Sequence, residues 1–227
     1  MKKTWLILTA LFLGSQAYAH NVWLENVKDS AQQYVVKFGH EETESYPQQK
    51  LKAVSWLDLQ GKMHGAKWQM QAGEAHFSAP DAALVFIQFD NGIWSKLPNG
   101  KYVEKTKKEA PDAVLSMNAM KLGKRILQWN DAALQAHQQE YEMVPQAVAK
   151  AGEKLAILVL HQGKPVANIK VSNGEDQPFV LTDEKGIAHF DVKSGNNRVW
   201  AKFTETSTDN PDYAERRIEY LLTFDAR

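Results

Sequence analysis

The sequence predicts an all-β protein built from two β-sandwich units. Short runs rich in β-branched and aromatic residues recur along the chain, at intervals of roughly 8–12 residues. Glycine, asparagine and aspartate stand between these runs, as turns between antiparallel strands require. Only one stretch, residues 113–134, has apolar residues at loosely helical spacing, so we expect a short helical or irregular connecting segment there.

The N-terminal unit, predicted over residues 20–150, begins with a β-hairpin. Residues 22–25 and 34–38 have the composition of strands, and a polar turn separates them. A turn centred near Ser30 pairs residues whose numbers sum to about 60, which places His20 opposite His40. Directly opposed residues have Cβ atoms about 5 Å apart, close enough to share a metal ion. A slip of one residue would place the two histidines on opposite faces.

Three further strands of this unit are predicted at residues 51–59, 63–70 and 82–89. The sequence Asp90-Asn91-Gly92 predicts a tight turn, after which the chain returns as a new strand. Residues 140–152 are expected to link this unit to the second one.

The second unit, predicted over residues 151–227, has the clearer β pattern. Its strands are separated by glycine-containing and aspartate-containing turns, which is typical of an immunoglobulin- or transthyretin-like sandwich. The strands are expected at residues 155–160, 166–171, 187–192, 198–203 and 217–224.

Residues 1–19 have the three parts of a secretory signal peptide. Lys2 and Lys3 precede an apolar run at residues 5–13, and Ala17-Tyr18-Ala19 is a small-x-small cleavage site. The apolar run is shorter than the roughly 20 residues that a membrane span needs, and no later stretch is long enough. We therefore expect cleavage after Ala19 and a periplasmic protein that does not span the membrane.

Charge and composition narrow the classes of function. The chain has 27 basic and 27 acidic residues. Cleavage removes Lys2 and Lys3, which leaves 25 basic against 27 acidic residues and a net charge of −2. This balance argues against nucleic acid as a partner. The chain has neither a nucleophilic-serine elbow nor a His-Glu-x-x-His motif, so we expect no enzymatic activity.

Because the chain has no cysteine, a metal site must use His, Asp, Glu, Met or the N-terminus. Cleavage after Ala19 makes His20 the first residue, so its free α-amine and imidazole Nδ1 can hold one ion together. His40 is the expected second ligand, and the remaining candidates are Glu41, Glu42, His64 and His76. Imidazole suits Ni²⁺, Co²⁺, Cu²⁺ and Zn²⁺ alike. The alternative is that His20 is only the first ordered residue, His40 caps a strand, and His64 and His76 are solvated.

The chain resembles a family of periplasmic components associated with nickel and cobalt uptake, which carry a nickel-transport-associated domain of unknown function. The resemblance rests on three stretches of the first half, at residues 19–25, 38–40 and 89–94, and on two of the second, at residues 163–166 and 182–186. The second half is also similar to transthyretin-like and carboxypeptidase-regulatory modules. The resemblance implies handling of Ni²⁺ or Co²⁺ beside membrane metal transporter components.

We therefore expect a periplasmic protein that binds Ni²⁺ or Co²⁺ and supplies a membrane uptake system. Two alternatives stay open. One is a copper-binding or copper-delivery protein that uses the same N-terminal histidine brace. The other is a metal-free β-sandwich module that binds a protein partner.

Overall fold

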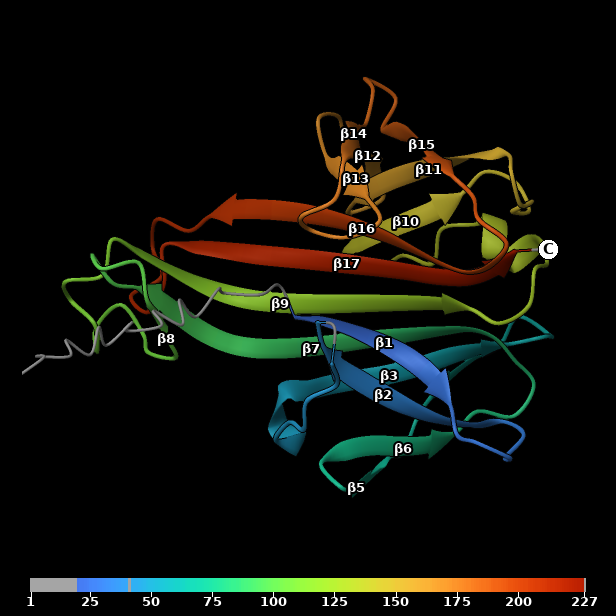
Figure 1. Ribbon diagram of the computed structural model, residues 1–227, viewed down its shortest axis with the longest axis horizontal. Helices are drawn as coiled ribbons and strands as arrows, with labels where there is room; N and C mark the ends of the chain where they lie inside the picture. Colours follow the sequence, from blue (N-terminus) through green and yellow to red (C-terminus); the bar gives the residue numbers. More distant parts are fainter. Residues whose placement is uncertain (1–19, 41, 227) are drawn as a thin grey trace, which may run out of the picture.

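The computed structural model describes residues 20–40 and 42–226, which form three β-sheets (Figure 1). The predicted signal peptide and Glu41 lie outside the described residues. The N-terminal sheet has the order β1-β2-β6-β5, and the C-terminal sheet has the order β10-β11-β12 with β15 also paired to β11. The middle sheet has the order β14-β13-β16-β17-β9-β7-β3-β4, with β8 also paired to β7.

The N-terminal sheet consists of β1 (Asn21–Asn26), β2 (Gln33–Gly39), β5 (Gln69–Gln71) and β6 (Glu74–Ser78). The C-terminal sheet consists of β10 (Tyr141–Pro145), β11 (Lys154–His161), β12 (Lys164–Pro165) and β15 (Ile187–Asp191). The middle sheet consists of β3 (Leu51–Asp58), β4 (Met63–Gly65), β7 (Ala82–Lys96), β8 (Tyr102–Val103), β9 (Leu115–Ile126), β13 (Lys170–Ser172), β14 (Phe179–Leu181), β16 (Gly195–Thr206) and β17 (Glu215–Ala226). Two short 3-10 helices, η1 (Gln48–Lys50) and η2 (Asp131–Leu134), complete the described elements.

The three sheets form layers, with the middle sheet between the other two. Strand β7 shows this directly, because alternate side chains of a strand point to opposite faces. Its Leu84 and Phe86 belong to the hydrophobic core shared with the C-terminal sheet. Its Val85 and Ile87 belong to the core shared with the N-terminal sheet. Burial on both faces explains why this strand is a continuous apolar run in the sequence.

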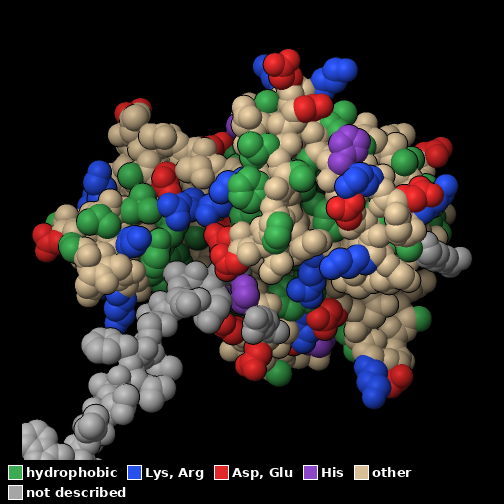
Figure 2. Space-filling view, turned by 45° about the horizontal axis from the view of Figure 1, so that its top comes forward, with side chains coloured by type: hydrophobic (Ala, Val, Ile, Leu, Met, Phe, Trp, Pro, Cys, Tyr) green, Lys and Arg blue, Asp and Glu red, His purple; other side chains and the backbone are tan. Residues whose placement is uncertain are grey.

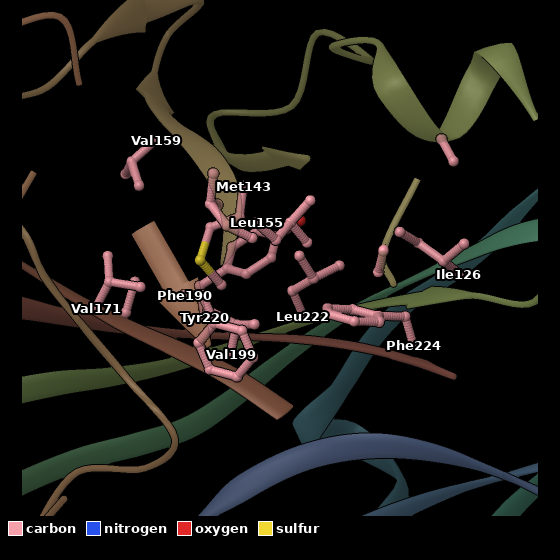
Figure 3. Packing of buried hydrophobic residues seen from close by; sticks show 14 of the residues in the cluster. Ile126, Met143, Leu155, Val159, Val171, Phe190, Val199, Tyr220, Leu222 and Phe224 are labelled. Carbon is pink, nitrogen blue, oxygen red and sulfur yellow. The ribbon is translucent and has the colours of Figure 1, made fainter. Parts of the chain in front are cut away.

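The core beneath the C-terminal sheet is shown in Figure 3. Met143 of β10 and Leu155 of β11 face Tyr220 and Leu222 of β17, and all four side chains are buried. Strand β17 comes from the second half of the chain and pairs in parallel with β9 from the first half. Both halves of the chain therefore contribute strands to one middle sheet. The all-β fold with sandwich packing is confirmed, and the two sandwiches share this sheet.

The prediction of a helical stretch at residues 113–134 is wrong. Most of it forms β9, and only η2 at its end is helical, as a single 3-10 turn. Strand β9 lies between β7 and β17, so both of its edges are paired. One of its faces meets β1 at Gly123, and on the other face Lys124 reaches the carbonyl of Met143 in β10. Lys121 and Lys124 are buried in β9 together with apolar residues. The sequence therefore lacks the alternation of apolar and polar residues that marks a half-exposed strand.

The turn predicted at Asp90-Asn91-Gly92 is also wrong. The chain continues straight on as β7, and the three residues form an irregularity in its pairing with β9 between Asp90 and Ile93. Gly92 has φ +92°, and its amide donates to Asp90 Oδ1 at 3.0 Å. A bulge can use the same glycine and aspartate chemistry as a turn, so the local sequence did not separate the two.

The hairpin at the start of the chain is confirmed, including its register. Asn21 pairs with Gly39 and Val22 pairs with Phe38, so paired numbers sum to 60 as predicted. Strand β1 then crosses the middle sheet at Gly123 of β9. A Cβ at Gly123 would lie 3.3 Å from Ile87 Cβ and 3.3 Å from the carbonyl oxygen of Val22.

A Gly123→Val variant is expected to lose about 1–3 kcal/mol of unfolding free energy, because the added side chain must push β1 away from the sheet. Urea unfolding monitored by tryptophan fluorescence measures this loss. Gly65→Val in β4 is the matched control, since no atom lies within 4 Å of a Cβ built there. A loss at Gly123 no larger than that at Gly65 would contradict the close crossing.

Among the described residues, no helix is long and apolar enough to cross a membrane.

Candidate functional site

A cleft of about 490 Å³ opens where the start of β1 meets the middle sheet. We call it the His20 cleft. Its wall includes His20, Phe38 of β2 and Trp94 of β7 from the first half of the chain. Lys202 of β16 and Glu219 of β17 contribute from the second half. The cleft is thus framed by the shared middle sheet on one side and by the N-terminal hairpin on the other.

Aromatic packing fixes the position of His20. Its imidazole stacks on the ring of Phe38, with centroids 4.9 Å apart, and Phe38 stacks in turn on Phe89 at 4.8 Å. Tyr46 meets both phenylalanines edge to face. Its hydroxyl donates to the carbonyl of Val36 at 2.8 Å, and burial raises its pKa to about 12. This rigid base holds the imidazole at the rim of the cleft.

The polar partner of His20 is Glu44, whose Oε1 lies 2.7 Å from His20 Nε2. Glu44 reaches this position because the chain turns back sharply after β2. Gly39 has φ +146°, it bridges to Thr43, and the amide of Glu44 donates to the carbonyl of Phe38 at 2.8 Å. A Cβ on Gly39 would lie 2.1 Å from the carbonyl oxygen of Glu42, so only glycine fits this turn.

The contact with Glu44 decides which imidazole nitrogen is left for a ligand. The Glu44 carboxylate accepts a hydrogen bond from Nε2–H, so in the neutral imidazole Nδ1 is the unprotonated nitrogen. Nδ1 is also the nitrogen that can close a six-membered chelate ring with the α-amine of the same residue. A carboxylate that holds the other ring nitrogen is the usual second partner of a metal-binding histidine.

The rest of the wall carries charges of both signs. Lys50 Nζ lies 2.8 Å from Glu104 Oε1, and it donates to the carbonyl of Asn91 in the β7 bulge at 3.0 Å. Lys121 and Glu219 form a buried ion pair at 2.7 Å. Further out, Lys202 Nζ lies 3.2 Å from Glu175 Oε1, and Arg217 is hydrogen-bonded to Glu215 through Nε. Figure 2 shows basic and acidic side chains interspersed over one face of the molecule.

The other predicted ligands differ in how near they lie to His20. His40 is half-buried and follows the last hairpin pair, Asn21 with Gly39, by one residue, as His20 precedes it by one on the other strand, but His40 is not part of the cleft wall. Glu42 is exposed, and Glu41 lies outside the described residues. His76 of β6 pairs with Val35, which itself pairs with Glu25. That register puts His76 five residues along the strand direction and two strands away from His20, so the two histidines lie more than roughly 16 Å apart.

His64 has a structural environment of its own. It lies on β4 opposite Trp56 and stacks on that indole, with centroids 4.9 Å apart. Its Nε2 lies 2.6 Å from Asp58 Oδ2, and this hydrogen bond holds the pKa of the Asp58 carboxyl below its usual range. Trp56 is five residues along β3 from Leu51, whose partner Phe89 lies in the stack beneath His20, so His64 is roughly 16 Å from that stack.

The chain was compared with known protein families, and the match covers strands of all three sheets. Residues 17–203 match the family described as "Domain of unknown function (DUF4198)". The chain belongs to this family. A Haemophilus influenzae protein named "Uncharacterized protein" is 55% identical to this chain over 227 residues. The alignment covers 100% of this chain and 99% of that protein.

This DUF4198 chain has a second polar cluster that the sequence did not predict. Ligand atoms of Glu140, His161 and Glu205 lie within 4.8 Å of one another. Arg216 already occupies the cluster, with Nη1 3.2 Å from Glu140 Oε1 and 2.9 Å from Glu205 Oε2. His161 Nε2 lies 3.3 Å from Glu205 Oε1, at an angle that makes no hydrogen bond. An arginine between the two carboxylates already supplies the positive charge that a metal ion would bring.

We call Glu140, His161, Glu205 and Arg216 the Arg216 cluster, and their contacts give it a structural role. The ring of His161 stacks on Tyr141 at 4.6 Å, and Tyr141 is hydrogen-bonded to Glu205 through its hydroxyl. Burial and the neighbouring Glu205 raise the pKa of Tyr141. These contacts tie the C-terminal sheet to β16 and β17 of the middle sheet. Only the pairing of distant strands brings the residues together, so no local sequence pattern announces them.

Proposed function

We propose that the mature protein is a periplasmic carrier of a divalent transition metal, Ni²⁺ or Co²⁺, and that it supplies a membrane uptake system. The metal would bind to the α-amine and Nδ1 of His20 at the rim of the His20 cleft. The observation that carries the proposal is the 2.7 Å contact between His20 Nε2 and Glu44 Oε1. It orients the imidazole and leaves the nitrogen next to the α-amine as the donor.

Two further features support this reading over a structural role for His20. The residue is only half-buried and lines a cleft, so an ion can reach it. The stack on Phe38 restrains the imidazole before any metal arrives, which lowers the entropic cost of binding. The preference for nickel or cobalt comes from the resemblance of the sequence to periplasmic uptake components. Nitrogen donors alone would bind Cu²⁺ more tightly than Ni²⁺.

The decisive experiment compares two forms of the protein by isothermal titration calorimetry with Ni²⁺. One form begins at His20, and the other carries a single glycine in front of it. The extra residue turns the α-amine into an amide and leaves every side chain unchanged. We expect the affinity to fall by about 100-fold or more, because one of two chelating nitrogens is lost and the other cannot hold the ion alone.

Two controls make the result specific. His189→Ala removes an exposed histidine on the far edge strand β15 and should leave the affinity unchanged. A competition between Cu²⁺ and Ni²⁺, with spectra of each complex, distinguishes a copper-delivery protein from a nickel or cobalt carrier. Equal Ni²⁺ affinity in the processed and extended forms would rule out the N-terminal ligand.

A further inference from the structure

We infer that the His20 cleft takes its metal as a complex with a small amino-acid chelator, and that the cleft walls recognise the chelator. This inference rests on the proposed function, because it assigns the remaining coordination positions of the same metal ion. It follows from three properties of the cleft, which are the shortage of free protein donors, the space available, and the balance of charge on its walls.

The described part of the wall offers too few free donors for a complete metal site. His20 supplies two nitrogens, whereas Ni²⁺ and Co²⁺ take four to six ligands. The carboxylates of the wall are already committed to other partners. Glu44 holds His20, Glu104 holds Lys50, Glu175 holds Lys202, and Glu219 holds Lys121. His20 is the only histidine among the described residues that line the cleft.

The cleft is also much larger than a single ion requires. Its volume of about 490 Å³ lies within the range of roughly 300–1,000 Å³ that is usual for small-molecule sites. A water molecule occupies only about 30 Å³ of liquid. Trp94 and Tyr102 add aromatic surface to the wall. A chelator bound to the metal at His20 would therefore have both room and an apolar surface to lie against.

The charges of the wall select the type of chelator. Its described residues include four cationic side chains and four carboxylates, which balance one another: Lys50, Lys121, Lys202 and Arg217 against Glu44, Glu104, Glu175 and Glu219. A polyanion such as citrate would meet as much repulsion as attraction there. An amino acid chelates through its amine and one carboxylate, and that carboxylate can accept a hydrogen bond from Lys202, whose ammonium has three donors and gives one to Glu175. The balanced wall thus favours an amino-acid chelator.

The test uses the processed full-length chain beginning at His20 and four titrants: Ni²⁺ alone, L-histidine alone, the equimolar Ni²⁺–L-histidine complex, and Ni²⁺–citrate. We expect the Ni²⁺–L-histidine complex to bind in a 1:1 ratio, about 10-fold or more tightly than Ni²⁺ alone. In Lys202→Gln the affinity for this complex should fall by about 10-fold, while that for Ni²⁺ alone should not fall. Lys154→Gln, in an ion pair on β11 outside the cleft, is the matched control.

The outcomes separate this inference from the proposed function. If Ni²⁺ binds but L-histidine strips it from the protein without forming a ternary complex, the inference is overturned and the proposed function stands. Equal or tighter binding of Ni²⁺–citrate overturns the choice of an amino-acid chelator. Absence of binding by every nickel form overturns both. Thermal melting of Lys202→Gln confirms that its effect is not a loss of folding.

Discussion

Replacing Glu142 with alanine is expected to lower the free energy of unfolding by about 3–5 kcal/mol, because it leaves two backbone amides without acceptors and removes the negative charge that favours the buried Lys124 ammonium. The Glu142 side chain is fully buried between the middle and C-terminal sheets, and so is that of Lys124 on β9. The two carboxylate oxygens accept hydrogen bonds from the backbone amides of His137 and Gln139, at 2.7 and 3.0 Å. The alanine variant would therefore leave these two amides without acceptors and Lys124 without the nearby negative charge.

Urea unfolding followed by circular dichroism measures this loss. Glu184→Ala, in an exposed turn, serves as the control and should change stability by less than about 0.5 kcal/mol. Glu142→Gln adds a second comparison, because it keeps one of the two acceptor oxygens but loses the charge, so its cost should lie between the other two. A loss of unfolding free energy below about 1 kcal/mol for Glu142→Ala would show that the core tolerates the buried Lys124 without the nearby carboxylate.

The second large effect concerns pH. Burial lowers the pKa of the Lys124 ammonium to about 8 from its ordinary value of 10.5, although the nearby Glu142 acts in the opposite direction. Between these two values the unfolded chain holds the proton and the folded chain does not, so folding stability rises with pH. The full gain is about 3 kcal/mol, and below the folded pKa the cost of the buried charge is present in full.

We therefore expect the free energy of unfolding to increase by about 1.5 kcal/mol between about pH 8 and about pH 9.5, measured by urea titration at several pH values. The buried tyrosines oppose this rise mainly above about pH 10, where the unfolded chain ionises its tyrosines first, because burial raises the pKa of Tyr46 to about 12 and that of Tyr220 further still. The comparison therefore ends at about pH 9.5. Lys124→Met removes the titrating group, so its stability should be flat over the same interval. A wild-type profile as flat as that of Lys124→Met would refute the assignment.

The sequence contained enough information to predict the N-terminal hairpin, because its two strands are local and each carries a clear pattern. The register, in which the numbers of paired residues sum to 60, followed from the position of one turn. Strand β9 was unpredictable for the opposite reason. Its covering layers come from β1 and β10, on either side of the sheet. Two lysines are buried in it: Lys121 is paired with Glu219, and Lys124 donates to the carbonyl of Met143 and is favoured by the nearby charge of Glu142.

The candidate site was predictable only in part for related reasons. His20 could be identified because signal cleavage would make it the first residue. Its partner Glu44 could not be identified, because the turn after Gly39 depends on a backbone conformation that the sequence does not specify. The Arg216 cluster joins residues as far apart as Glu140 and Arg216, so only the tertiary structure reveals it.

The parallel pairing of β9 with β17 has a consequence for how the two halves of the chain depend on each other. A fragment ending at residue 150 would lack β17, so β9 would become an open sheet edge that invites association with other chains. The same fragment would lack Lys202 and Glu219 from the cleft. A ligand bound there contacts both halves of the chain and stabilises only the state in which both are folded together. Occupancy of the cleft would thus report on the integrity of the whole molecule, and resistance to proteolysis anywhere along the chain should increase when the ligand is bound.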